Sequence, residues 1–148
     1  GKPVPVNPYR LRTAPRSGMA IVAAAGPLSN LITAGLVSLL FRLGIIEFHS
    51  LSTISLSSIF STFILYIILY NLILAIFNLM PIAPLDGFKI AVGILPRNWA
   101  ISLAKTERYG PMILLIVIVL SFYTDILWNV IGGGVNFFSN IFLGGDLI

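Results

Sequence analysis

The chain has 148 residues, of which 57% are hydrophobic and only 9% are charged, with a net charge of +4 and a mean hydropathy of +1.00. Soluble domains carry about a quarter charged residues, so this composition excludes an ordinary soluble globule and predicts an all-α integral membrane protein. The chain has no cysteine, which excludes disulfides, thiolate metal sites and a cysteine nucleophile; it also lacks a basic face interleaved with aromatic residues, so we expect no nucleic-acid partner.

Residues 1–16 form a basic, proline-rich start that contains no acidic residue. Pro3, Pro5 and Pro8 favour extended backbone, because proline locks φ and disfavours a helical residue before it. The first ten residues lack the apolar stretch of a signal peptide. This start is typical of the middle of a longer protein, and we expect residues 1–148 to form a single membrane domain.

Three segments are long and apolar enough to be membrane-spanning helices, each of which needs about 20 residues. They cover approximately residues 17–43, 57–80 and 110–131. Pro27 should kink the first helix or mark a restart, because proline removes a hydrogen bond from a helix interior. Pro111 suits the first turn of the third helix, where the missing N–H is unpaired anyway.

The connection between the second and third spans differs from both of them in composition. Pro81 and Pro84 should end the second span. Residues 87–108 then mix apolar and basic side chains around Trp99. This mixture predicts two short helices that lie at the membrane interface and are broken at Pro96.

Basic residues predict the orientation of the chain. They gather in the N-terminal segment and in the connection between the second and third spans, which contains Lys89, Arg97, Lys105 and Arg108. The positive-inside rule therefore predicts that both of these segments are cytoplasmic. Three spans would then place the C-terminus outside.

The end of the chain is apolar and rich in glycine. The triplet Gly132–Gly134 is expected to end the third span. Residues 135–143 are apolar but too short to cross a membrane, so we expect them to be interfacial or re-entrant.

Two polar, proline-containing motifs fall in the same half of the membrane under this topology. They are "GPLSN" at residues 26–30 in the first span and "NLMPIAPLDG" at residues 78–87, where the second span ends. A broken helix exposes backbone N–H and C=O groups that lipid cannot satisfy, so such breaks must face protein or water. We therefore expect the two motifs to lie near one another.

Asp86 is the candidate functional residue of the second motif. One interpretation is structural: Asp86 would be the N-cap of the next helix, with Lys89 as a nearby counter-charge. The other is a metal-ligating or catalytic carboxylate, because an acidic residue near hydrocarbon is expensive and marks a functional site by default. The residues themselves leave both interpretations open.

Several small and amide residues accompany these motifs. Gly26, Asn30 and Thr33 share one helix face, where they could pack neighbouring helices closely and form interhelical hydrogen bonds, or line a site. Asn71 is better suited to joining helices, whereas Asn78 lies beside the proline break and is the stronger site candidate.

Three stretches in this order resemble the site-2 protease family of intramembrane zinc metalloproteases. The segment "KPVPVNPYRLR" is similar to an extended loop that follows the first catalytic helix in a bacterial and archaeal subgroup. The stretch "AAAGPLSN" resembles the family's Ala-Gly-Pro-x-x-Asn helix, and "NLMPIAPLDG" resembles its Asn-Leu-x-Pro and Leu-Asp-Gly signature. The resemblance covers roughly residues 1–95, and Ala83 departs from it where the subgroup often has proline.

The resemblance implies a role for each matching residue. Asp86 would be the third zinc ligand, and Asn78 and Pro81 would help to hold an unwound substrate near the metal. The remaining matches would line the site or support it structurally: Gly26, Pro27, Asn30, Pro84 and Gly87. The implied cofactor is Zn²⁺, in a bacterial or archaeal cell membrane.

The complete zinc site requires ligands that this chain does not contain. Catalytic zinc takes three protein ligands and a water, and the family supplies two of them from a His-Glu-x-x-His helix whose glutamate is the general base. That motif is absent here, and the only histidine, His49, lies in the first connection, where we expect it to be solvated. We therefore expect no catalytic residue in this chain and no activity from it by itself.

Two functions of different classes remain. The first is part of an intramembrane zinc metalloendopeptidase that hydrolyses transmembrane protein substrates, as in regulated intramembrane proteolysis. The alternative is a catalytically inactive pseudoprotease, or a small helical membrane subunit, that binds transmembrane partners. Both place the chain in a lipid bilayer.

Overall fold

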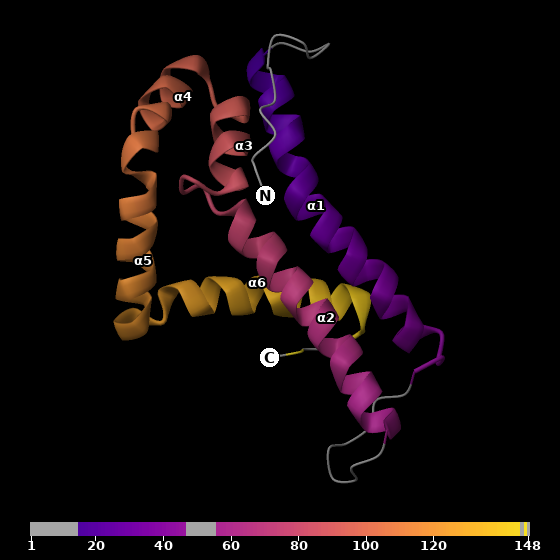
Figure 1. Cartoon of the computed structure of the whole chain (residues 1–148). Coiled ribbons are helices and arrows are strands. Elements are labelled where there is room, and N and C mark those ends of the chain that lie inside the picture. Colours follow the sequence, from indigo (N-terminus) through magenta and orange to yellow (C-terminus); the bar gives the residue numbers. More distant parts are fainter. Residues whose placement is uncertain (1–14, 47–55, 146, 148) are drawn as a thin grey trace.

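The computed structural model describes residues 15–46, 56–145 and 147. Within these ranges the chain forms helices and no strands (Figure 1). The predicted all-α membrane architecture is therefore confirmed. The proline-rich residues 1–14 and His49 lie outside the described residues.

Two long helices form the centre of the molecule. Helix α1 runs over Pro15–Arg42 and helix α2 over Leu56–Leu79, and they pack side by side (Figure 1). Both are long and apolar enough to cross a membrane, over Ser17–Arg42 and Leu56–Leu79, as the sequence predicts. Helix α1 continues through Pro27 without a restart.

The two prolines end α2 as expected. Helix α2 stops at Leu79, and residues 80–85 form a short connection in which the Ala83–Pro84 peptide bond is cis. The connection is held by short-range backbone bonds, since Ile82 N–H donates to the Met80 carbonyl at 2.8 Å and Leu85 N–H donates to the Ile82 carbonyl at 2.9 Å. This compact turn lets the chain leave α2 and start a new helix at once.

The next segment contains two short helices broken at Pro96, as predicted. Helix α3 spans Asp86–Ile94 and helix α4 spans Arg97–Ala104, with Pro96 as the N-cap of α4. A 3-10 helix, η2, follows at Glu107–Tyr109. Helix α3 packs against both α1 and α4.

The third span departs from its predicted limits. Helix α5 spans Gly110–Thr124, and helix α6 spans Ile126–Phe142. The segment Arg97–Thr124, which α5 ends, meets α6 at an angle of 88°. The backbone turns at Asp125, whose φ of 51° is left-handed and ends a right-handed helix. With 15 residues, α5 is about 22 Å long, shorter than the roughly 30 Å hydrocarbon core, so a third span exists only if the bent pair is counted as one.

The glycine triplet does not end a helix. Gly132–Gly134 lies inside α6, and residues 135–143, expected to be a separate segment, contain the second half of that helix. Packing explains one of these glycines, because a Cβ on Gly134 would lie only 2.8 Å from Cδ1 of Ile76 in α2. A small residue therefore lets α6 cross α2 closely (Figure 1).

The hydrophobic core lies where α1, α2 and α6 meet. Helix α6 contributes buried residues at every fourth position, which places them on one face: Leu127, Ile131, Val135 and Ser139. They pack with buried residues of α1 and α2, including Ala34, Phe41, Ile68, Leu72 and Ile76. Helix α5 takes no part in this core, because only Gly110 and Ser121 of its residues are buried.

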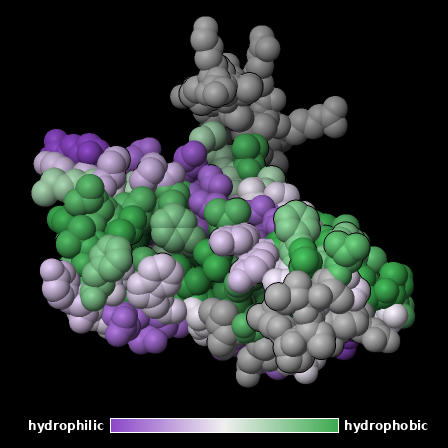
Figure 2. Space-filling model, turned by 60° about the horizontal axis from the view of Figure 1, so that its bottom comes forward, coloured by the Kyte–Doolittle hydropathy of each residue, from purple (hydrophilic) through white to green (hydrophobic). Residues whose placement is uncertain are grey.

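The outer surface is largely apolar. Large hydrophobic side chains are exposed on every long helix, among them Ile21, Leu36, Phe63, Phe122 and Phe137. Broad green areas cover the face in Figure 2, and the hydrophilic residues form smaller separate groups. Such a surface suits lipid, since soluble monomers rarely expose apolar patches of this extent.

Candidate metal centre

Asp86 is the first residue of α3 and lies directly after the proline-containing connection. The N-cap of α3 is Leu85, with extended backbone at φ −67° and ψ 157° and no capping hydrogen bond from its side chain. The interpretation of Asp86 as the N-cap is therefore wrong. Its carboxylate is half-buried and is available for another role.

The Asp86 side chain lies against Gly26 of α1. A Cβ built on Gly26 would stand 2.8 Å from Oδ2 of Asp86, which is closer than real Cβ contacts allow. The glycine thus opens the space that the carboxylate occupies. The two motifs meet at this point, as their predicted depth in the membrane requires.

Gly87 fixes how α3 starts. A Cβ at Gly87 would overlap the backbone carbonyl of Leu79 and lie 2.5 Å from the Met80 carbonyl oxygen. The first turn of α3 therefore folds back against the last residues of α2, and only glycine permits this approach. The position of Asp86 follows from that contact, because Asp86 and Gly87 are adjacent in the chain.

The other predicted site residues surround this junction with different exposure. Asn78 is half-buried in the last turn of α2, and Pro81 and Pro84 are exposed in the connection. On α1, Pro27 is fully buried and Asn30 is half-buried one turn beyond Gly26. Among these residues, Asp86 and Gly26 belong to different motifs and approach each other directly.

The expected hydrogen bonds between helices are replaced by bonds within helices. The Asn71 side chain donates through Nδ2 to the Ile67 carbonyl at 2.8 Å, so its predicted role in joining helices is wrong. The Thr33 hydroxyl donates to the Ser29 carbonyl at 2.8 Å, and the Ser29 hydroxyl donates to the Gly26 carbonyl at 2.7 Å. These polar side chains are satisfied inside α1 and α2.

The described residues supply one metal donor at the junction. No hydrogen bond or ion pair joins the Asp86 carboxylate to another described residue, and a carboxylate oxygen is a donor that zinc accepts. Within the same ranges no three His, Cys, Asp or Glu side chains come together. Asp86 therefore fits the role of one zinc ligand, and the described residues do not complete a zinc site.

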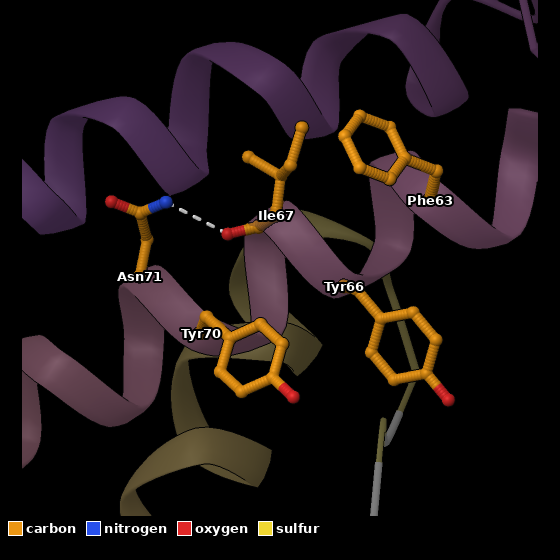
Figure 3. A pocket seen from close by; sticks show the side chains of 5 residues that line it. All are labelled: Phe63, Tyr66, Ile67, Tyr70 and Asn71. Atoms are coloured by element: carbon orange, nitrogen blue, oxygen red, sulfur yellow. Dashed lines mark hydrogen bonds between the residues drawn. The ribbon is translucent and has the colours of Figure 1, made fainter.

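A separate groove lies on the exposed face of α2 (Figure 3). Its volume is about 470 Å³, and the residues that line it are Phe63, Tyr66, Ile67, Tyr70 and Asn71. The Tyr66 and Tyr70 rings are stacked with centroids 6.0 Å apart. Eight residues separate Asn71 from the end of α2 at Leu79, about 12 Å along the helix, so this groove is not part of the Asp86 junction. The four-residue spacing of the tyrosines is its sequence signal.

The family comparison matches the central part of the chain. A family model described as peptidase family M50 matches residues 42–122. The match contains "NLMPIAPLDG" with Asp86 and reaches α5, well beyond residue 95, where the resemblance is expected to end. It begins after Gly26 and Asn30, so it does not include the Gly-Pro motif of α1.

A curated relative matches most of the chain. The "Putative zinc metalloprotease YwhC" of Bacillus subtilis (strain 168) is 34% identical over 137 residues, which are 90% of this chain and 60% of that protein. The chain thus spans about three-fifths of the length of this relative. No solved structure matches the chain. Since the family model covers more than half of the residues, the chain belongs to peptidase family M50, the site-2 protease family.

Proposed function

We propose that this chain is part of an intramembrane zinc metalloendopeptidase and that Asp86 is its third zinc ligand. The observation that carries the proposal is the approach of the Asp86 carboxylate to Gly26, where a Cβ would lie 2.8 Å from Oδ2. The two proline-containing motifs thus meet at a half-buried carboxylate that has no partner among the described residues. Membership of family M50 supports zinc peptidase chemistry.

Zinc bound at this junction would polarise a peptide carbonyl and lower the pKa of its bound water. The role of this chain is to present one oxygen ligand from a rigid corner. The close contact of Gly87 with the carbonyls of Leu79 and Met80 holds that corner in place. The remaining ligands and the general base come from residues other than those described, so we expect the 148 residues by themselves to be inactive.

The proposed substrates are transmembrane proteins, cleaved in regulated intramembrane proteolysis. A helical substrate hides its peptide groups in its own hydrogen bonds and must unwind before hydrolysis. Asn78 and the exposed Pro81 flank the end of α2, and residues 80–85 form a non-helical turn beside which an unwound substrate strand could lie. We propose that Asn78 and Pro81 hold the substrate beside Asp86.

The proposal also includes the orientation of the protein in the membrane and the residues that support the site. We place the protein in a bacterial or archaeal cell membrane with the start of α1 on the cytoplasmic side, because basic residues gather at that end. Pro27, Asn30 and Pro84 would then line or support the site. Apolar helices long enough to cross a membrane support the bilayer environment.

The test is a substitution of Asp86 in the whole protein that the gene encodes. Asp86→Asn keeps the size of the side chain but removes its charge, so bound zinc should fall from one per protein toward zero and cleavage of a transmembrane reporter should be lost. Asp125→Asn is the matched control, since Asp125 is exposed at the α5–α6 turn. Zinc is measured by elemental analysis after purification in detergent.

Three outcomes would overturn the proposal. Retained zinc and cleavage in Asp86→Asn would reject Asp86 as a ligand. If the unmutated protein has neither zinc nor cleavage activity, the enzyme is rejected in favour of the alternative function, a pseudoprotease or membrane subunit. Equal losses in Asp86→Asn and Asp125→Asn would also reject a specific role for Asp86.

A further inference from the structure

A second surface, at the α3–α4 segment, has no role in the proposed peptidase chemistry. An apolar groove of about 270 Å³ lies between α3 and α4, lined by Val92, Arg97, Ala100, Ile101 and Ala104. Four of these residues lie on α4 at spacings of three and four, which places them on one helix face. The groove therefore has an apolar floor and a guanidinium group at its margin.

A wider and more polar hollow adjoins the groove. It has a volume of about 700 Å³ and is lined by Ala104, Lys105, Glu107 and Arg108. Ala104 lines both hollows, so they are neighbours on the surface. Together they combine apolar side chains with Arg97, Lys105 and Arg108, and we call them the α4 groove.

The charge of this segment is unbalanced. Lys89, Arg97, Lys105 and Arg108 are all exposed, against Glu107 as the acidic residue in the α4 groove. No ion pair joins these basic side chains to another described residue. Arg108 lies 4.5 Å from the centroid of the Tyr109 ring, a cation–π contact that leaves its guanidinium group free to bind an anion. Asp86, the other acidic residue of the segment, is directed toward Gly26 of α1.

The neighbouring side chains are those of a membrane interface. Trp99 is 71% exposed and Ile94 is 75% exposed, although both are too apolar to favour water. Tryptophan prefers the headgroup level of a bilayer. In Figure 1, α4 lies at the end of the molecule where α1 begins and beyond the end of α2, hence at one end of both long helices.

We propose that the α4 groove binds an anionic phospholipid. The phosphate would lie among Arg97, Lys105 and Arg108, and an acyl chain would lie over Val92 and Ile101. Charge complementarity favours an anionic headgroup over a neutral one, and the apolar groove favours a lipid over a free phosphate ion. This inference is independent of the proposed proteolysis.

The test compares lipid binding by the whole protein in detergent. Phosphatidylglycerol should remain bound in native mass spectra and raise the unfolding temperature, whereas phosphatidylcholine with the same acyl chains and inorganic phosphate should do neither. Each basic residue near an anionic membrane surface contributes roughly a fivefold gain in binding. Arg97→Gln should thus weaken phosphatidylglycerol binding about fivefold, and Arg97→Gln with Lys105→Gln about 25-fold.

Two control variants separate lipid binding in the groove from a general effect of positive charge. Arg42→Gln makes the same exchange at an exposed arginine at the opposite end of α1 and should leave binding unchanged. Ala104→Trp fills the hollow without changing its charge and should weaken the binding of phosphatidylglycerol. Circular dichroism in lipid-free detergent confirms that each variant is folded.

The proposal fails if phosphatidylglycerol and phosphatidylcholine bind equally, or if Arg42→Gln weakens binding as much as Arg97→Gln does. It also fails if inorganic phosphate reproduces the stabilisation, because the site would then recognise an anion without its acyl chain. Unchanged binding in Ala104→Trp would reject the groove as the place of the acyl chain.

Discussion

Two aspartates stand at breaks between helices in this molecule, and their surroundings differ. Asp86 follows the α2–α3 connection, is half-buried and faces Gly26 across a gap too small for a Cβ. Asp125 forms the α5–α6 turn by itself, with left-handed backbone at φ 51°, and is exposed. An aspartate beside a helix break is therefore a site candidate only when other segments pack around its carboxylate, as they do at Asp86 and not at Asp125.

The largest expected effect concerns the backbone contact that holds Asp86. Gly87→Ala places a methyl group against the carbonyls of Leu79 and Met80, and backbone cannot move aside as a side chain can. We expect a loss of roughly 3 kcal/mol or more in stability, seen as a large drop in the thermal unfolding temperature in detergent.

The matched control substitutes a glycine in the helix that follows Asp125. Gly133 lies inside α6, and a Cβ added there would have nothing within 4 Å of it, so Gly133→Ala should stabilise the helix by up to about 1 kcal/mol. Similar unfolding temperatures for Gly87→Ala and Gly133→Ala would contradict the idea that the chain is packed more tightly around Gly87 than around Gly133.

A smaller effect on stability, but a large one on function, is expected at Gly26. The methyl group of Gly26→Ala would meet Oδ2 of Asp86 at 2.8 Å, and a carboxylate at the end of a side chain can rotate away. Stability should fall by about 1 kcal/mol or less, whereas misplacing a metal ligand by about 1 Å should lower cleavage of a transmembrane reporter about a hundredfold.

The same helix provides the control for Gly26. A Cβ at Gly35 would lie 3.5 Å from the Phe142 ring, an ordinary contact, so Gly35→Ala should retain both zinc and cleavage. Equal activity of Gly26→Ala and the unmutated protein would show that the contact with α1 does not position Asp86.

The two breaks also show what can be predicted from the sequence. At the α2–α3 corner the signals are local: Pro81 cannot continue a helix, and Gly87 follows the carboxylate directly. The end of α2 and the break at Pro96 can therefore be placed, and the meeting of two polar motifs follows from their depth in the membrane. The cis bond before Pro84 and the contact of Gly26 with Asp86 depend on packing between distant segments, which local patterns do not contain.

At the second break the local signal is weak, and composition gives a wrong prediction. No proline or glycine lies near Asp125, and neither side contains another charged residue, so the composition favours one helix over residues 110–131. The glycine triplet then suggests an end that α6 does not have. A better signal is the four-residue repeat of Leu127, Ile131 and Val135, because that spacing defines a helix face that extends through the triplet.

The smallest effect on zinc binding and cleavage should appear at Asp125 itself. Left-handed backbone costs a residue such as alanine about 1 kcal/mol, whereas glycine avoids this cost and the short polar side chain of aspartate reduces it by bonding locally. Asp125→Gly should therefore keep or slightly raise the unfolding temperature, and Asp125→Ala should lower it by the equivalent of about 1 kcal/mol. Neither should change zinc content, because this turn is not part of the Asp86 junction. A loss of zinc in Asp125→Gly would mean that the angle between α5 and α6 positions Asp86 after all, through the contact of Gly110 at the start of α5 with Ala83 in the connection.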